Sequence, residues 1–597
     1  MSSSPAFLSF GAFRLDVTNR LLLRGGEPIA LTPKAFDTLM VLVDARHRVV
    51  SKDELIETVW PDTFVSEATL TQNIYTLRKT LGEGADGPFI RTIPRRGYRF
   101  SATVTVETAP REPSQPSSEG SEPVRPDMAE AIRSLAVLPL RPLVSDEDNR
   151  LLGLGLADAV ITSLSNVSGL AVRATSSIMD YVDASVRDPV AIGRELRVDG
   201  VLEGTVQRIG SRLRVTLQLV SVEQGVACWA ETFQGAFRDL FAAQDAVAME
   251  VVTRLRFRLT HREEARLTRR STHSLEAYRT YVRGRYFWNR RTAADLRRAI
   301  ELFREAAALD PDYGRAYAGL ADALILLPFY GTARPGDSFR QARDAARRAI
   351  ELDPDLCEAH TSLAYTDFVY SHDWRAAEDG FRRALRHGAH YPTAHHWYAF
   401  LLTALGRHDE AIRLAHRALE LDPLSLVIST DLAMTYYFAR RNDDAIAQLT
   451  TVLEVTPTFG YAHFALALSL SQAQRHEQAI AAAIEATKLL PDSGAVTAVL
   501  GHVYGRTGRT EDARRVLESL TRDDRPTTQA SHRALVLVAL DEHRAAIDAL
   551  HRGREERSRF GALLGVWPAF DPLRSEPRFQ ALLTLLGLDH VPVGHPD

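Results

Sequence analysis

Cysteine is scarce in this chain, with only Cys228 and Cys357 among 597 residues. They are far apart in the sequence, so they supply neither a disulfide framework nor a cysteine-based zinc site, as is typical of a reducing compartment. No run of about 18 uncharged apolar residues occurs, so no transmembrane helix is predicted. The opening residues lack the basic region and apolar core of a signal peptide. We therefore expect a soluble protein of the cytoplasm that has no membrane partner.

Catalytic signatures are missing as well. The chain has no GxSxG elbow, no HExxH zinc motif and no P-loop. Six histidines gather between positions 387 and 416, but no acidic or cysteine ligand accompanies them at metal-site spacing, so we interpret them as packing or solvated residues. We expect no enzyme, no metal and no cofactor. The six are His387, His390, His395, His396, His408 and His416.

The formal net charge of −4 excludes a polycationic protein but leaves room for a local basic patch. The length predicts about three to five domains, or fewer with a repeat array. Residues 112–130, EPSQPSSEGSEPVRPDMAE, contain almost nothing apolar to bury and are typical of a flexible linker. We place a first domain at residues 1–105, the linker at 106–132, a second domain at 133–260 and a repeat array at 270–590.

The first domain has the pattern of short strands, three helices and a final hairpin. Gly25-Gly26 separates two apolar runs and suits a hairpin turn, because both residues tolerate positive φ. The helices are expected after Thr32, after a capping box at residues 51–54, and over residues 66–81 with Gly82 as the C′ residue. Residues 89–104 alternate and predict a second hairpin.

The second domain mixes helical and strand-like runs. Strand patterns occupy residues 134–140, 170–174, 200–209, 212–222 and 226–233, and helical patterns occupy 152–164, 190–196 and 237–259. Gly153 and Gly155 stand before a helical pattern, where a Gly-x-Gly pair is a weak phosphate-binding signal. We interpret them as residues of helix entry.

A repeat occupies the rest of the chain. Aligned alanines recur at intervals of 34, 34, 34, 34 and 33 residues, and two earlier ones stand 43 and 35 residues from the next. Five units carry a proline twelve residues after the alanine, which we expect to start the following unit. About eight units of paired helices are visible. The alanines are Ala299, Ala342, Ala377, Ala411, Ala445, Ala479, Ala513 and Ala546.

The helix predicted at residues 66–81 has an apolar face, which follows steps of four, three and four residues from Leu70 to Leu81. On the other side are polar residues; Gln and Asn can bond adenine, and Thr can contact a base edge or methyl group. Arg78 and Lys79 suit phosphates. Between residues 66 and 101, six basic residues face three acidic ones, a local balance of +3 that predicts a DNA reader. The polar residues are Thr69, Gln72, Asn73 and Thr76, and the hairpin adds Arg91, Arg95, Arg96 and Arg99.

The runs LTPKAFDTLMVLV, VSKDELIETVWPD, VSEATLTQNIYTLRKTLG and IRTIPRRGYRF closely resemble the OmpR/PhoB-type winged helix over residues 5–104. The resemblance implies that the third helix enters the major groove of double-stranded DNA and that the wing contacts the minor groove or backbone. It implies an RNA polymerase contact at residues 61–65. Many members are basic where this chain has Tyr75 and Thr76, so base preference does not transfer. The groove positions carried over are Thr69, Thr71, Gln72, Asn73 and Thr76, and the wing positions are Arg95, Arg96 and Arg99.

Two further resemblances concern the remaining segments. The run SLAVLPL and the stretch from GLGLADAVITSLSNVSGLAVRA to LFAAQDAVAMEVV resemble the TolB-amino-terminal-like α/β domain of bacterial signalling proteins. The helix pairs resemble tetratricopeptide repeats, which stack into a superhelix with a concave face. The receiver domain of response regulators and the transmembrane helix of CadC-like relatives are not seen, so the resemblance implies a soluble one-component regulator.

The expected fold is multidomain and mainly α: a winged helix-turn-helix, a mixed α/β domain and an α-solenoid of tetratricopeptide repeats. The favoured function is sequence-specific binding of double-stranded DNA in transcription regulation, with a protein partner or self-association through the repeats. Two alternatives stay open. The chain is an interaction scaffold whose winged helix docks protein, or it is a small-molecule sensor through its α/β domain.

Overall fold

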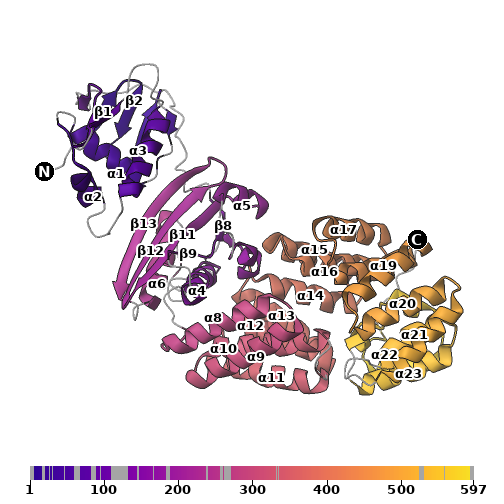
Figure 1. Cartoon of the computed structure of the whole chain (residues 1–597). Coiled ribbons are helices and arrows are strands. Elements are labelled where there is room, and N and C mark those ends of the chain that lie inside the picture. The colour runs from indigo at the N-terminus through magenta and orange to yellow at the C-terminus, as the bar shows by residue number, and fades with distance from the viewer. Residues whose placement is uncertain are drawn as a thin grey trace, which may run out of the picture. The chain divides into compact units, whose positions relative to one another are not determined.

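The computed structural model divides the chain into two compact units, Met1–Val124 and Arg125–Asp597 (Figure 1). Within the described residues, no helix is long and apolar enough to cross a membrane. The structure describes residues 6–16, 21–25, 27–29, 31, 33–45, 48–59, 67–81, 89–93, 96–108, 132–143, 147–165, 167, 169–182, 188–236, 240–255, 260, 271–330, 333, 335–523, 530–556, 559–589 and 591.

The first unit begins and ends in one antiparallel sheet of order β4-β3-β2-β1-β7. The hairpin expected around Gly25 joins β3 to β4, and Gly25 has φ +61°. The sequence patterns did not single out β1, β2 and β7. The strands are β1 (Ala6–Phe10), β2 (Phe13–Asp16), β3 (Leu21–Arg24), β4 (Glu27–Ile29) and β7 (Thr105–Thr108).

Three helices and a hairpin lie between these strands. They are α1 (Pro33–Asp44), α2 (Lys52–Val59), α3 (Glu67–Leu81), β5 (Ile90–Ile93) and β6 (Gly97–Phe100). The capping box at α2 is half formed: the Ser51 hydroxyl accepts from the Glu54 N–H at 3.1 Å, whereas the Glu54 carboxylate binds Arg48. The predicted apolar stripe of α3 is confirmed, since Leu70, Ile74, Leu77 and Leu81 are all buried in the core of the unit.

The second unit starts with a sheet of order β10-β8-β11-β12-β13, with β9 paired to β11. Strands β8, β10 and β11 run parallel, and β11 to β13 form an antiparallel meander. Helices α4 and α6 pack against each other and against this sheet. The elements are β8 (Ser134–Val137), β9 (Arg141–Pro142), α4 (Glu147–Leu164), β10 (Ala171–Val172), η1 (Thr175–Tyr181), α5 (Pro189–Glu195), β11 (Gly200–Ile209), β12 (Arg212–Ser221), β13 (Val226–Ala236) and α6 (Leu240–Arg254).

Gly153 and Gly155 do not mark a helix entry, because α4 begins at Glu147 and both glycines lie inside it. A Cβ on Gly153 would lie 2.0 Å from the Leu140 carbonyl oxygen, and one on Gly155 would lie 3.1 Å from Val282. The Tyr278 hydroxyl also donates to the Gly155 carbonyl at 2.6 Å. The two glycines therefore permit close packing, and Gly155 joins the α/β domain to the first helix of the array.

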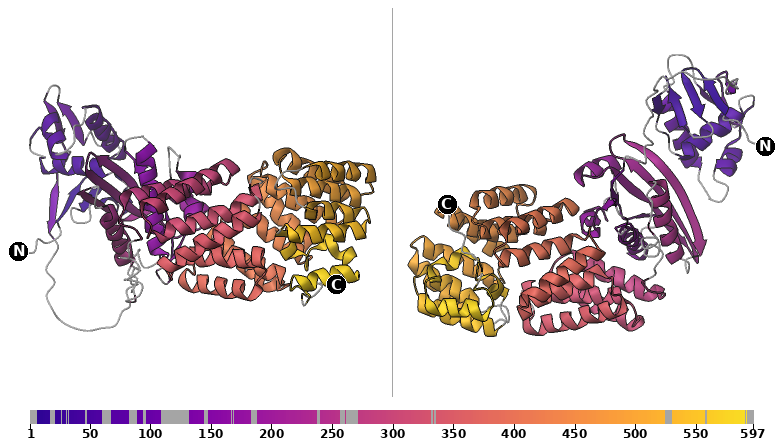
Figure 2. Two further views of the ribbon diagram at one scale, coloured as in Figure 1. Left: turned by 90° about the horizontal axis from the view of Figure 1, so that it is seen from below. Right: turned by 180° about the vertical axis from the view of Figure 1, so that it is seen from behind.

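Eight helix pairs follow in the described residues and form a curved stack (Figure 2). All eight aligned alanines are buried, as the repeat pattern predicts. The pairs are α8 (Leu275–Asn289) with α9 (Ala293–Leu309), α10 (Gly314–Leu326) with α11 (Pro335–Leu352), α12 (Cys357–Thr366) with α13 (Trp374–His387), α14 (Pro392–Ala404) with α15 (His408–Leu421), α16 (Leu426–Phe438) with α17 (Asn442–Val455), α18 (Gly460–Gln472) with α19 (His476–Leu489), α20 (Gly494–Arg506) with α21 (Thr510–Arg522), and α22 (Ala530–Ala539) with α23 (His543–Glu555).

Departures from the 34-residue period have structural causes. The 43-residue interval contains a 3₁₀ turn, η3 (Leu327–Tyr330), between α10 and α11. The 35-residue interval contains a π-helical turn, η4 (Asp367–Ser371), at the end of α12. A π turn inserts one residue into an α-helix, which accounts for the extra position.

The repeat prolines do not start the next helix. Pro311 follows Asp310, the C-cap of α9, and α10 begins only at Gly314. Proline in that turn stops the preceding helix, because it cannot continue the hydrogen-bond ladder. Residues 559–589, the C-terminal segment, contain η5 (Arg559–Leu563), η6 (Pro568–Leu573) and α24 (Pro577–Leu585). This segment packs back on the array: the Trp374 indole donates to the Leu586 carbonyl at 2.9 Å, and Arg440 pairs with Asp571 at 2.8 Å.

Candidate nucleic-acid interface

The outward face of α3 carries polar residues and one aromatic ring. Thr71, Tyr75 and Lys79 follow one another at steps of four and are exposed, with Tyr75 at 61%. Asn73 and Thr76 lie nearer the core stripe and are half-buried. Sequence reasoning missed Tyr75 as a candidate contact, although its four-residue spacing from Thr71 and Lys79 was the available signal. This face offers hydroxyl, aromatic and ammonium groups on a rigid helix.

Arg78 links α3 to the hairpin instead of pointing to solvent. Its guanidinium donates to the Ile90 carbonyl from Nε at 3.3 Å and from Nη2 at 2.9 Å. Nη2 also donates to the Thr92 hydroxyl at 2.9 Å. These bonds hold β5 against the helix, so the two surfaces predicted to contact DNA are fixed relative to each other.

The β5–β6 hairpin presents a row of exposed arginines. Arg91 lies directly opposite Arg99, and both are exposed, as is Arg96 near the turn. Like charges opposite each other in a ladder are destabilising, so a bound anion would relieve their repulsion. Gly97 has φ +128°, and a Cβ there would lie 2.0 Å from the Val50 carbonyl oxygen. Only glycine therefore lets the hairpin pair with Val50.

The structure brings most of the sequence-predicted residues onto α3 and the hairpin. Thr69 and Gln72 lie within α3, but their side chains are outside the described part, and Arg95 is outside the described residues altogether. The structure places Thr71, Asn73, Thr76 and Lys79 on α3, Arg91 and Arg99 on the hairpin strands and Arg96 beside the turn. Arg78 bonds Ile90 and Thr92 within the chain, and in this geometry it positions the hairpin beside α3.

In the described part of the structure, five of the six array histidines each contact a different partner. His396 pairs with Asp431 at 2.6 Å, and His395 bonds the Ala389 carbonyl at 2.9 Å. His416 bonds the Tyr436 hydroxyl at 2.8 Å, while burial lowers the pKa of His390 and of His408. His387 lies 3.3 Å from Asp355. Acidic partners do exist: Asp431 comes from the next repeat and Asp355 from the turn before α12, at spacings that the sequence pattern did not reveal.

Family models match three parts of the chain. Residues 26–100 match the model described as transcriptional regulatory protein, C terminal, and residues 131–250 match the second domain of HilA/YgeH-like transcriptional regulators. Residues 363–425 and 402–468 match tetratricopeptide repeats. With the winged helix and the helix pairs, these matches define the class: the chain has the architecture of a transcription regulator, with an OmpR/PhoB-type DNA-binding domain, a HilA-like domain and a tetratricopeptide region.

Individual relatives include regulators and one protein named as an enzyme. The transcriptional regulator HilA of Salmonella typhi is 24% identical over 423 residues, 70% of this chain and 71% of HilA. Putative adenylate cyclase 3 of Rhizobium meliloti is 33% identical over 242 residues, 40% of this chain and 41% of that protein, so the chain spans less than half of that relative. The DNA-binding domain of Escherichia coli CadC is 30% identical, covers 17% of this chain and 98% of the domain, and has a TM-score of 0.16.

Proposed function

We propose that the chain is a one-component transcription regulator that binds double-stranded DNA sequence-specifically through α3 and the β5–β6 hairpin, and that it does so in the cytoplasm without catalysis. The observation that carries this is the pair Arg91 and Arg99, held beside the polar face of α3 by the Arg78 hydrogen bonds. A helix of this width fits the major groove, and arginines beside it reach phosphates or the minor groove.

The residues proposed to contact DNA are assigned different roles. On α3, the residues proposed to contact base edges are Thr69, Thr71, Gln72, Asn73 and Thr76. Tyr75 is added to them because its side chain is exposed. Lys79, Arg91, Arg95, Arg96 and Arg99 are proposed to contact the backbone or minor groove, and Arg78 is proposed to position the wing. RNA polymerase contact at residues 61–65 rests on resemblance alone. The array is proposed to receive a protein partner or a second copy of this chain.

The test is selection of genomic fragments with the full chain beside two matched variants. An Asn73→Ala, Arg91→Ala, Arg99→Ala variant removes proposed contacts. An Arg14→Ala, Arg24→Ala control removes two exposed arginines from strands β2 and β3. We expect the wild type and the control to enrich one shared sequence and the contact variant to lose it.

Salt dependence separates this function from its rival, a scaffold whose winged helix docks protein. Binding through phosphates must weaken as salt rises, because counterions are released. If none of the three proteins enriches a DNA sequence at moderate salt, the scaffold function is favoured.

A further inference from the structure

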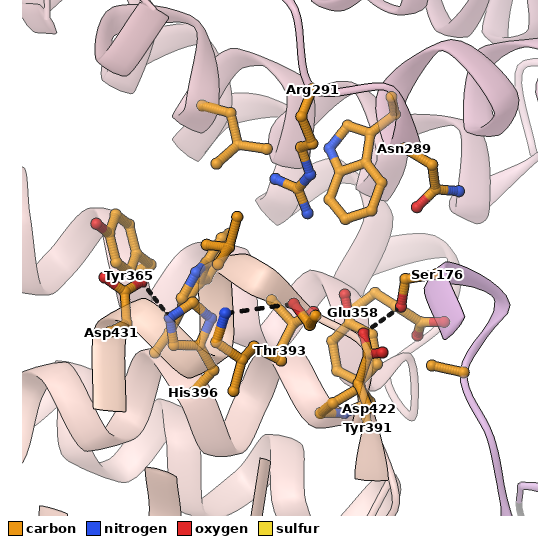
Figure 3. A pocket seen from close by; sticks show the side chains of 18 of the residues that line it. Ser176, Asn289, Arg291, Glu358, Tyr365, Tyr391, Thr393, His396, Asp422 and Asp431 are labelled. Atoms are coloured by element: carbon orange, nitrogen blue, oxygen red, sulfur yellow. Dashed lines mark hydrogen bonds and ion pairs between the residues drawn. The ribbon is translucent and has the colours of Figure 1, made fainter. Parts of the chain in front are cut away.

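The second unit contains a cavity of about 1080 Å³ between the α/β domain and the inner face of the array. Its lining comes from α4 and η1 on one side and from helices of successive repeats on the other (Figure 3). Pockets for small molecules span roughly 300–1,000 Å³, so this one has room for a complete ligand.

The α/β domain is joined to the array beside this cavity. The Ser176 and Ser177 hydroxyls donate to the two carboxylate oxygens of Asp422 at 2.5 and 2.6 Å, and Arg315 donates to Thr162 at 3.1 Å. Phe560, from the C-terminal segment, also lines the cavity. Three parts of the chain therefore line one chamber.

One wall holds a group of donors built around Trp288. The Trp288 ring lies 4.5 Å from the Arg285 guanidinium carbon and 3.8 Å from that of Arg291. Trp288 is 2% exposed, and among the described residues neither its Nε1 nor the Arg285 Nε has a hydrogen-bond partner. Buried donors without acceptors are costly, so an acceptor from a ligand is the expected complement. Figure 3 shows Arg291 pointing from this wall toward the one that carries His396 and Asp431.

Carboxylates also lie near these guanidiniums. The Arg285 guanidinium lies 4.0 Å from the Asp322 carboxylate, and burial raises the pKa of Asp322 to about 6. Two carboxylates of the lining, Asp422 and Asp431, have hydrogen-bond partners of their own. Asp422 accepts the two serine hydroxyls, and Asp431 binds His396 and, at 2.6 Å, the Tyr461 hydroxyl.

We propose that this cavity binds a small organic anion. Its carboxylate, sulfonate or phosphate group lies against the Trp288 indole N–H and the Arg285 and Arg291 guanidiniums. Its apolar body lies along Tyr365, Trp397 and Phe400 of the lining. This anion site would give the proposed regulator a signal input. Its role as a signal rests on the proposed function, whereas ligand binding itself does not. Because Ser176 and Asp422 line the same chamber, occupancy would act on the joint between the α/β domain and the array.

The probe is 8-anilinonaphthalene-1-sulfonate, an aromatic anion, titrated into the full chain by calorimetry with no DNA present. We expect one saturable site. Arg291→Ala and Trp288→Phe should each weaken binding about tenfold or more, as expected for hydrogen bonds to a charged group. Trp288→Phe keeps an aromatic ring in the core, so it removes the donor with little change in packing. The control Arg298→Ala removes a 46% exposed arginine that pairs with Glu301 on α9, and should bind like the wild type.

The second probe is thioflavin T, a cationic dye whose charge is opposite to that of the sulfonate. Equal binding of the sulfonate by Arg291→Ala, Trp288→Phe and Arg298→Ala would overturn the proposal. Tighter binding of thioflavin T than of the sulfonate, rising further in Arg291→Ala, would overturn it too and mark a cation site. Helical circular dichroism of each variant checks folding. Loss of DNA binding alone would leave the cavity result standing, so failure of the two proposals is distinguishable.

Discussion

Arg91 and Arg99 lie directly opposite each other on the β5–β6 hairpin, with both side chains exposed. Two like charges in that position oppose hairpin formation and favour an anionic partner. Stability and DNA affinity should therefore respond in opposite directions when one charge is removed.

Arg91→Thr tests this relationship. We expect the free energy of unfolding of residues 1–124 to rise by about 0.2–1 kcal/mol, because the repulsion is removed. DNA affinity should fall, and the slope of log affinity against log salt should become shallower by about 0.9 for one lost phosphate contact. Urea denaturation and fluorescence anisotropy measure the two quantities. A variant that is less stable yet binds DNA unchanged would contradict the assignment.

Arg78→Met tests whether Arg78 positions the wing. The side chain is half-buried and donates to Ile90 and Thr92, so its loss should lower the free energy of unfolding of residues 1–124 by about 1–2 kcal/mol. Urea denaturation measures it. Lys79→Met is the neighbouring control: Lys79 is exposed, and its replacement should weaken DNA binding while leaving stability unchanged. Equal stability of the two variants would mean that the Arg78 bonds contribute nothing.

Gln474→Gly tests the turn between α18 and α19. Gln474 has φ +59°, and the equivalent positions two repeats before and one after are Gly406 and Gly508, with φ +71° and +76°. A non-glycine residue in this conformation destabilises the fold by about 1–2 kcal/mol. Glycine removes that strain, but it loses more conformational entropy on folding, which offsets part of the gain. We expect a net stabilisation of about 0.5 kcal/mol in urea denaturation of the full chain. Gly508→Ala should do the reverse, and a destabilised Gln474→Gly would show that the side chain stabilises the turn.

His502 tests the acid sensitivity of the array. Burial lowers the pKa of His502 to about 4, and its Nδ1 lies 3.1 Å from the Leu535 carbonyl oxygen. An unfolded histidine has a pKa near 6.5, so between about pH 6.5 and 4 the unfolded chain binds a proton that the folded repeat excludes. Stability is therefore fully present above pH 6.5 and is lost as pH falls, by about 1.4 kcal/mol per pH unit.

Urea denaturation at several pH values gives the slope of the free energy of unfolding against pH. His502→Gln should remove the part of that slope that His502 contributes. His476→Gln, at an exposed position, is the matched control and should keep the wild-type slope. Identical slopes in the two variants would show that His502 is not the group that titrates.

Local pattern was enough for the elements that carry the candidate interface. The stripe from Leu70 to Leu81 predicts α3 and its buried side, because a 3.6-residue period places those residues on one face whatever surrounds them. The alanine period predicts the helix pairs for the same reason. The pattern was not enough for Arg78, since a basic residue at a helix end suits phosphate and carbonyl partners equally well. Only the fold brings the Ile90 carbonyl within reach.

The sequence by itself determined the order of the segments, the periodic core of each helix, and the basic hairpin after α3. Tertiary structure alone decided that Gly155 packs against Val282, that Ser176 and Ser177 meet Asp422 some 245 residues later, and that two guanidiniums lie over the Trp288 ring. Periodicity depends on neighbours within a turn or two of the chain. A joint or a cavity depends on residues that share no period, so it exists only once the chain has folded.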